Sequence, residues 1–294
     1  MEKRYLLLNA DDFGLCRSAN AAVIDLFQNG FLRSATVMTP CPGAEEAARF
    51  AAEHPEYAIG VHLTTTNEWG ERWPWGALTH ASSLETPEGR MWRDSPEFEA
   101  HARRGEIVRE LRAQVERARE FGMKPSHLDN HMGSLYGLHG RRTLLLLVFR
   151  LCGRERLPFR MCVRAAREYA PCEVPYSLYR LFCGITRTLS RLYRVPTPDY
   201  LILSDQLAVL DRAESYERFR QAFLEVLGGI PAGITETFVH PALDTEEMRA
   251  ITGAWRRRYW EYLFLRDPEV KAFLDRAGIA LIDYRELVRL KTNK

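Results

Sequence analysis

The sequence predicts an α/β fold built around a largely parallel sheet, and two observations support that class. Short runs of β-prone residues alternate with longer segments of helical period, which is the pattern of repeated β-α units. No interdomain linker, internal repeat or low-complexity tract separates these units. We therefore expect a single domain over residues 1–294, interrupted by two atypical segments.

The expected elements follow one another in a regular order. Strands are expected at residues 5–9, 34–38, 58–63, 126–129, 159–163, 200–203, 234–239 and 279–282. Helices fill most of the gaps: one runs from residue 18 to 29 and is stopped by Gly30, and another is opened by Pro42 and ends near residue 54. Residues 106–121 and 214–227 have the clearest amphipathic spacing.

Two segments depart from this alternation. Residues 64–97 are rich in Trp, Gly and Pro and too irregular for one element, so we expect a functional loop over the sheet. Residues 164–198 are expected to form a helical insertion, a hairpin or a lid, because residues 176–193 place aromatic residues, leucines and arginines at roughly helical spacing.

Composition argues against several classes of protein. The net charge of +2 is too small to indicate nucleic-acid binding, and no apolar run approaches the length of a membrane span. The first apolar run is short, so no secretory signal is expected. Six cysteines without a C-x-x-C pair argue against a zinc-thiolate site or a disulfide framework. Reduced thiols and a cytoplasmic location are therefore expected.

Unusual polar residues fall at the ends of four expected strands. Asp11 and Asp12 follow the first strand, His62 closes the third, His131 follows the fourth and His240 follows the seventh. A barrel of parallel strands presents its working groups at their carboxyl ends, so these side chains are expected to converge. An Asp-Asp pair alone is more often a turn or helix cap, and one histidine is more often a core residue. Four such features at matching strand ends favour a functional site.

The residue types indicate metal chemistry. Two neighbouring carboxylates repel each other, which favours a cation on one of them and leaves the other as a base. One carboxylate and two imidazoles, here Asp12, His62 and His131, can hold a divalent metal such as zinc and leave positions open for water and substrate.

The ordered set of motifs resembles the YdjC-like family of carbohydrate deacetylases. The motifs are NADDFG at residues 9–14, GVHL at 60–63, HLDNH at 127–131 and TETFVHP at 235–241, and the correspondence runs over residues 6–287. The resemblance implies an α/β fold, a distorted TIM-like (β/α) barrel of about seven strands, as in polysaccharide deacetylases. It also implies a metal-dependent hydrolase that removes the acetyl group from an N-acetylated sugar and releases acetate.

The same resemblance assigns roles to the polar residues at the strand ends. Asp11 is the general base, and His240 is the candidate general acid. The residues that hold a zinc or magnesium ion are Asp12, His62 and His131.

Further residues are candidates for contact with the sugar. Trp69, Trp73 and Trp75 lie in the long loop and either stack on sugar rings or staple the loop to the sheet. Asp129 of the HLDNH motif is another candidate, and Arg160 is the candidate for contact with an anionic group of the substrate.

An excess of arginine marks residues 141–194, which hold twelve arginines and three acidic residues. It fits contact with a phosphorylated or otherwise anionic sugar, a solvated face with ordinary ion pairs, or a basic amphipathic helix that meets a glycolipid headgroup at a membrane interface. The expected partner is a small sugar substrate, without nucleic acid and without a membrane span. Peripheral glycolipid contact and a homodimer stay open.

Two alternative functions remain. The chain departs from the family pattern at Gly133, where relatives often carry the second histidine of Asp-x-His-x-His. This departure leaves open a carbohydrate-binding protein without turnover. A metal-dependent hydrolase of a phosphoester is the other alternative, because a His-Asp metal site does not dictate which bond is cleaved.

Overall fold

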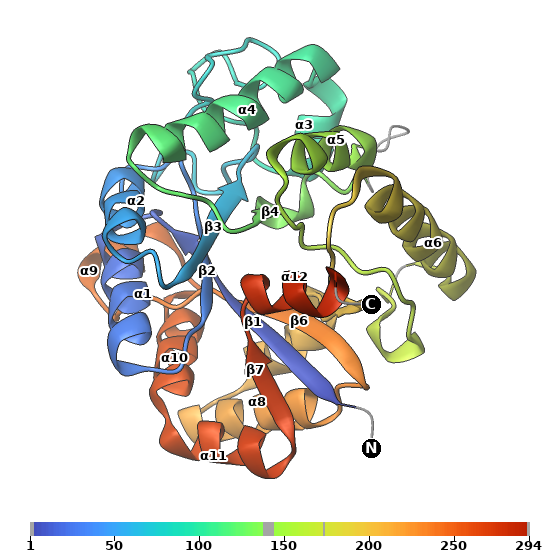
Figure 1. Cartoon of the computed structure of the whole chain (residues 1–294). Coiled ribbons are helices and arrows are strands. Elements are labelled where there is room, and N and C mark those ends of the chain that lie inside the picture. Colours follow the sequence, from blue (N-terminus) through green and yellow to red (C-terminus); the bar gives the residue numbers. More distant parts are fainter. Residues whose placement is uncertain (1–2, 138–143, 173, 293–294) are drawn as a thin grey trace.

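The centre of the molecule is a curled parallel sheet (Figure 1), seen in a computed structural model that describes residues 3–137, 144–172 and 174–292. The strands are β1 (Arg4–Phe13), β2 (Ser34–Val37), β3 (Ala58–Leu63), β4 (Leu128–Asn130), β5 (Tyr200–Leu201), β6 (Gly233–Val239) and β7 (Ile279–Ile282). Their order is β4-β3-β2-β1-β6-β5, and β7 pairs with the first residues of β1. All of these ladders are parallel, which confirms the predicted α/β class.

Helices pack around this sheet, most of them on its outer face (Figure 1). They are α1 (Arg17–Asn29), α2 (Ala44–Glu53), α3 (Ser95–His101), α4 (Arg104–Glu120), α5 (Leu145–Glu155), α6 (Tyr176–Tyr193), α7 (Ser204–Leu207), α8 (Tyr216–Gly228), α9 (Glu246–Ile251), α10 (Trp255–Arg266), α11 (Pro268–Arg276) and α12 (Tyr284–Thr292). The four helices expected from the sequence correspond to α1, α2, α4 and α8. The loop expected at residues 64–97 is irregular up to the start of α3, apart from one bridge between Glu85 and Met91.

The strand expected at residues 159–163 is not a strand of the sheet. Phe159 makes a single parallel bridge to Leu128, and the backbone N–H of Arg160 donates to the carbonyl of Leu128. Pro158 precedes this segment and has no N–H to donate, which limits a continuous ladder. The segment therefore extends beside β4 without ladder pairing, and the curled sheet is an incomplete barrel, as the predicted distorted barrel requires.

The predicted insertion at residues 164–198 holds one long helix. Its described part contains a single 3-10 turn at Arg167–Tyr169, followed by α6, which packs against α5. Arg141, Arg142 and Glu173 of the arginine-rich segment lie outside the described residues.

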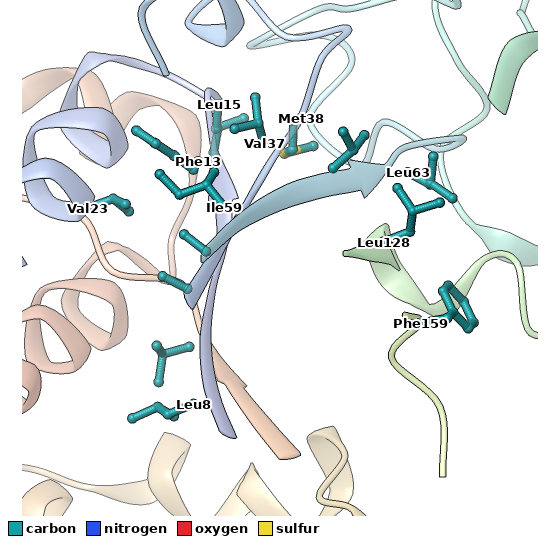
Figure 2. Close-up of a cluster of buried hydrophobic side chains, with 14 of the residues drawn as sticks. Leu8, Phe13, Leu15, Val23, Val37, Met38, Ile59, Leu63, Leu128 and Phe159 are labelled. Carbon is teal, nitrogen blue, oxygen red and sulfur yellow. The ribbon is translucent and has the colours of Figure 1, made fainter. Parts of the chain in front are cut away.

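The main hydrophobic core lies between the sheet and its helices. Figure 2 shows part of it, with Leu8, Val37, Ile59 and Leu128 contributed by four neighbouring strands and Val23 contributed by α1. These side chains point outward because side chains alternate between the two faces of a strand. The residues that alternate with them along each strand point to the concave face.

Helix α12 lies within the curl of the sheet and covers part of its concave face (Figure 1). A small second cluster of buried apolar residues forms there, made of Leu7, Ile234, Ile282, Tyr284 and Leu287. Buried polar residues also point to the concave face, among them Asn9, Thr36, His62, Asp129 and Glu236. The fold thus supports a polar interior on an apolar base, directly below the carboxyl ends of the strands.

Candidate active site

The last residues of β1 bring two aspartates to the carboxyl end of the sheet. Strand β1 runs to Phe13, beyond the end expected at residue 9, and its register with β2 shifts between Ala10 and Phe13. Asp12 has a φ of 60°, a left-handed conformation that aspartate tolerates better than most residues. This irregularity breaks the strict alternation of faces, and Asp11 and Asp12 both line one cavity.

That cavity has a volume of about 620 Å³ and gathers most of the predicted site residues. The predicted residues that line it are Asp11, Asp12, His62, His131, Arg160 and His240. Asp129 and the three tryptophans of the long loop are not among its lining residues. Residues far apart in sequence therefore meet at one place, at the carboxyl ends of the strands.

Three of these residues form a compact cluster. Oδ1 of Asp12 lies 3.6 Å from Nε2 of His62 and 3.5 Å from Nδ1 of His131. The centroids of the two imidazole rings are 5.4 Å apart, and the rings are inclined at 70°. All three side chains are buried, and one ligand atom from each lies within 4.8 Å of the others. The structure thus brings the three predicted metal ligands together.

The cluster fits a cation. Oδ1 of Asp12 is buried and has no hydrogen-bond partner in the part of the chain that the structure describes. A buried carboxylate oxygen is costly unless a donor or a positive charge compensates it. Burial raises the pKa of Asp12, but the Arg258 guanidinium and His131 outweigh burial and hold that pKa well below its usual range. Asp12 is therefore ionised at neutral pH, as a metal ligand must be.

A carboxylate orients each of the two imidazoles. Asp129 lies 2.8 Å from Nδ1 of His62, and Glu68 lies 2.8 Å from Nε2 of His131. Such pairs fix the tautomer of a ligating histidine and strengthen its bond to a metal. Burial lowers the pKa of His131, but Glu68 and Asp12 raise it to about 10. A metal ion that binds there at neutral pH must therefore displace a proton from His131.

Asp11, the predicted base, is held by a buried arginine. Nη1 and Nη2 of Arg160 donate to the two carboxylate oxygens of Asp11 at 2.6 and 2.7 Å. Burial raises the pKa of Asp11, whereas Arg160 and His62 lower it, so that the pKa is about 2. The carboxylate is ionised throughout the neutral range. So weak a base can accept a proton readily only from a donor whose own pKa has been lowered.

Arg160 binds two further carboxylates. Its Nη2 lies 2.9 Å from Asp129, and its Nε lies 2.7 Å from Glu236. One buried guanidinium therefore pairs with three acids below the cavity. In the structure, Arg160 and Asp129 are paired with each other. Their expected contacts with the substrate, an anionic group for Arg160 and the sugar for Asp129, stay predictions.

A second group of residues has metal-ligand geometry, namely Asp11, His62 and Asp129. Both of its carboxylates already pair with Arg160, Asp11 through hydrogen bonds and Asp129 through an ion pair, whereas Oδ1 of Asp12 has no hydrogen-bond partner among the described residues. The cluster that contains Asp12 therefore fits a cation better.

His240, the predicted acid, follows β6 directly. Its backbone N–H donates to Glu261 of α10 at 2.7 Å, which fixes the chain where the ring enters the cavity wall. Burial lowers the pKa of the His240 ring, and the neighbouring Asp12 opposes that effect only in part. The ring is therefore neutral at neutral pH until further negative charge develops beside it.

The three tryptophans hold the long loop in place. Trp75 is buried and its indole N–H donates to the carbonyl of Thr66 at 3.1 Å, while that of Trp73 donates to the carbonyl of Leu15 at 3.0 Å. Trp69 packs edge-to-face on Trp75 with ring centroids 6.1 Å apart. These contacts support the stapling alternative, and stacking on sugar rings stays a prediction.

Gly133, where the chain departs from the family motif, has a local backbone reason. Its φ is 63°, and a Cβ there would lie 3.1 Å from the ring of Tyr136. A larger residue would be strained at this position. The turn that follows His131 therefore favours glycine at the place where relatives often carry a histidine.

Sequence reasoning missed two residues that contact the cluster of Asp12, His62 and His131. Glu68 stands in an irregular loop, where no periodicity or motif marks it. Arg258 of α10 donates from Nη2 to Oδ2 of Asp12 at 2.8 Å, across 246 positions of sequence. No local signal could have connected residues so far apart.

Comparison with known proteins finds carbohydrate deacetylases. The family model described as YdjC-like protein matches residues 5–276. A carbohydrate deacetylase of Geobacillus stearothermophilus is 32% identical over 291 residues, which cover 98% of this chain and 99% of the relative. A carbohydrate deacetylase of Brevibacillus brevis is 28% identical, over 96% of this chain and 99% of the relative.

A solved structure from Enterococcus faecalis has a similar fold. It is described as a candidate cellobiose-phosphate cleavage protein and is 27% identical, with a TM-score of 0.73 over 97% of this chain and 99% of the other. The agreement extends over nearly the whole length of both chains.

Proposed function

The chain belongs to the YdjC-like family, and we propose that it is a metal-dependent deacetylase that hydrolyses the acetamide of an N-acetylated sugar. The family predicted from the motifs is confirmed, and so is the enzyme class, a carbohydrate deacetylase. One observation carries the rest of the proposal. An unpaired carboxylate oxygen of Asp12 lies beside two imidazoles, and an ionised second aspartate lines the same cavity.

Asp12, His62 and His131 would hold the metal ion. When bound there, a divalent ion supplies Lewis acidity, which lowers the pKa of a water and polarises the acetyl carbonyl. Two imidazole nitrogens favour zinc over magnesium, because magnesium prefers oxygen ligands.

Asp11 accepts the proton of the attacking water. The water oxygen bonds to the acetyl carbon, and the π electrons of the carbonyl move to the acetyl oxygen. Two hydrogen bonds from Arg160 keep Asp11 ionised and fixed in orientation before this step. When Asp11 becomes protonated, Asp129 and Glu236 still neutralise Arg160, so no buried cation is left without a counter-charge.

His240 gives a proton to the amine nitrogen as the C–N bond breaks. Without that proton the amine would leave as an unstable anion. Burial holds the pKa of the ring low, and the negative charge that forms on the acetyl oxygen raises it, so the ring becomes charged when the step needs it. The proton that charges the ring is the one that Asp11 took from water, so both residues return to their starting states once the amine nitrogen has received it. The products are acetate and a free amino sugar.

Mass spectrometry tests this proposal. N-acetylglucosamine oligomers are incubated with the zinc-loaded wild type and with Asp11→Asn. We expect the wild type to remove one acetyl mass and release one equivalent of acetate, and the variant to do neither although it still binds metal. Asp275→Asn, at an exposed position of α11, is the matched control and should keep wild-type activity. Equal activity of Asp11→Asn and the wild type would remove Asp11 from its role.

The same assay separates the alternatives. The description of the Enterococcus faecalis relative names a phosphorylated disaccharide, so a phosphoester substrate is tested beside the N-acetyl substrate. Phosphate release without acetate would favour a phosphoesterase. Tightly bound metal without either product would favour a carbohydrate-binding protein.

Partners other than the sugar stay proposals. Helix α6 carries several exposed large apolar side chains, at Leu178, Leu181, Ile185 and Leu192. It also carries exposed arginines, at Arg180, Arg187 and Arg191, and no acidic residue. This composition supports peripheral contact with lipid headgroups, which co-sedimentation with anionic vesicles tests. Among the described residues, no helix is both long and apolar enough to cross a membrane. A homodimer, a single domain and a cytoplasmic location stay predictions.

A further inference from the structure

Arg258 reaches the cavity from α10 and leaves one of its donors unused. The side chain is 8% exposed, its Nη2 donates to Oδ2 of Asp12, and its guanidinium lies 5.2 Å from the ring centroid of Trp69. Its Nη1 is buried and has no hydrogen-bond partner within residues 3–137, 144–172 and 174–292. The guanidinium is therefore held in place by two contacts while one charged donor stays unpaired.

An unpaired buried cationic donor is unusual, because burial removes the water that would otherwise solvate it. The other arginines that line the cavity differ from Arg258 in this respect. Arg160 is bound by three carboxylates, and Arg257 contacts Asp211 and Glu261. Among the described arginines that line this cavity, only Arg258 has a buried nitrogen without a hydrogen-bond partner, namely Nη1. Its capacity to donate a hydrogen bond is therefore unused.

We propose that Nη1 of Arg258 binds the acetyl oxygen of the substrate and the carboxylate of the product acetate, while Nη2 positions Asp12. This inference rests on the proposed deacetylation and adds a catalytic residue to it. Negative charge develops on the acetyl oxygen in the transition state, and a fixed cation placed there stabilises that state more than the neutral amide. The product acetate carries a full negative charge and should occupy the same donor.

The position of the guanidinium favours the acetyl oxygen over a sugar hydroxyl. Nη1 and Nη2 belong to one rigid planar group, and Nη2 is bonded to a residue of the metal cluster. Nη1 is therefore also held close to Asp12, and so to the place where the metal ion and the acetyl group would meet. A lysine could pair with Asp12 through its single ammonium. It could not bind Oδ2 of Asp12 and the acetyl oxygen at the same time with the same fixed geometry.

Kinetics and metal binding of Arg258→Lys separate the two roles of the guanidinium. We expect the Kd for zinc, measured by titration of the metal-free protein, to stay within about threefold of wild type, because a cation still neighbours Asp12. We expect kcat to fall by about 100-fold while KM changes little, as for the loss of one oxyanion donor. Arg256→Lys, at an exposed position of the same helix, should match wild type in both measurements.

A rescue and a binding measurement make the inference independent of folding and of turnover. Added guanidinium ion, at concentrations well below denaturing ones, should restore part of the kcat of Arg258→Ala. Acetate should raise the Tm of the zinc-loaded wild type and of Arg256→Lys, but not of Arg258→Lys.

The outcomes distinguish this inference from the proposed function. Wild type that releases no acetate from any N-acetyl sugar would refute the deacetylation. An unchanged kcat in Arg258→Lys, a change confined to KM, or an acetate shift that persists in this variant would overturn the role of Arg258. Loss of zinc affinity as large as the loss of kcat would also overturn it, because the side chain would then act only through Asp12.

Discussion

Asp12→Asn should abolish the stabilisation that zinc gives to this protein. At zinc concentrations of 100 times Kd, a ligand that binds only the folded state adds about 2.7 kcal/mol to the free energy of unfolding. A chain of 294 residues has an unfolding entropy of about 0.6 kcal/mol/K near its Tm, so the expected shift is about 4 °C. Asparagine keeps the shape of Asp12 but removes the negative charge beside the two imidazoles.

Differential scanning fluorimetry measures this shift with and without zinc. We expect about 4 °C for the wild type and less than about 1 °C for Asp12→Asn. Asp129→Asn should regain the shift at higher zinc concentrations, because Asp129 orients His62 rather than binding the ion. Asp275→Asn on the surface should behave as wild type. The reasoning is refuted if Asp129→Asn abolishes the shift and Asp12→Asn retains it, since the ion would then occupy the other group of potential ligands.

Three further predictions follow from single side chains. Glu68→Gln should weaken zinc binding by about tenfold in a chelator competition assay, because glutamine lacks the negative charge that strengthens the bond of His131 to the metal. The exposed Glu71→Gln should bind zinc as the wild type does, and equal affinities of the two variants would contradict this prediction. Burial raises the pKa of Glu236 from 4.5 to about 7, so the folded state binds a proton that the unfolded chain releases, and stability should fall as the pH rises from 5 to 7. Glu236→Gln should flatten that dependence by up to about 3 kcal/mol in urea unfolding, and an unchanged slope would exclude the raised pKa. Trp75→Ala should lower the free energy of unfolding by about 3 to 5 kcal/mol, because the indole is buried under the long loop, and a loss below about 1 kcal/mol would show that the loop is held elsewhere.

Much of the site was predictable because of where its residues stand along the chain. Asp11, His62, His131 and His240 all come at or just after the end of an expected strand, and the carboxyl ends of parallel strands share one edge of a sheet. The structure places these residues around one cavity for that reason. Their catalytic and metal-binding roles stay proposals until the variants are measured.

Local patterns were insufficient where packing decides the structure. Residues 159–163 are mostly apolar and have the composition of a strand, yet the segment forms only one bridge to β4. Arg160 in that segment pairs with three buried acids, which come from β1, β4 and β6, and its expected contact with a substrate anion stays a prediction. Only the assembled interior brings those acids within reach of one guanidinium.

The sequence by itself determined the parallel α/β fold, its main helices and the polar residues at the strand ends, because periodicity and turn residues act between neighbours in the chain. Tertiary structure alone decided which charges pair. Glu68 and Arg258 reach the cluster of Asp12, His62 and His131 from a loop and from a distant helix, and their influence depends on distances in space that no local pattern contains. Electrostatic pairing in a buried site depends on those distances and on the loss of water around them, and both arise only when the chain has folded.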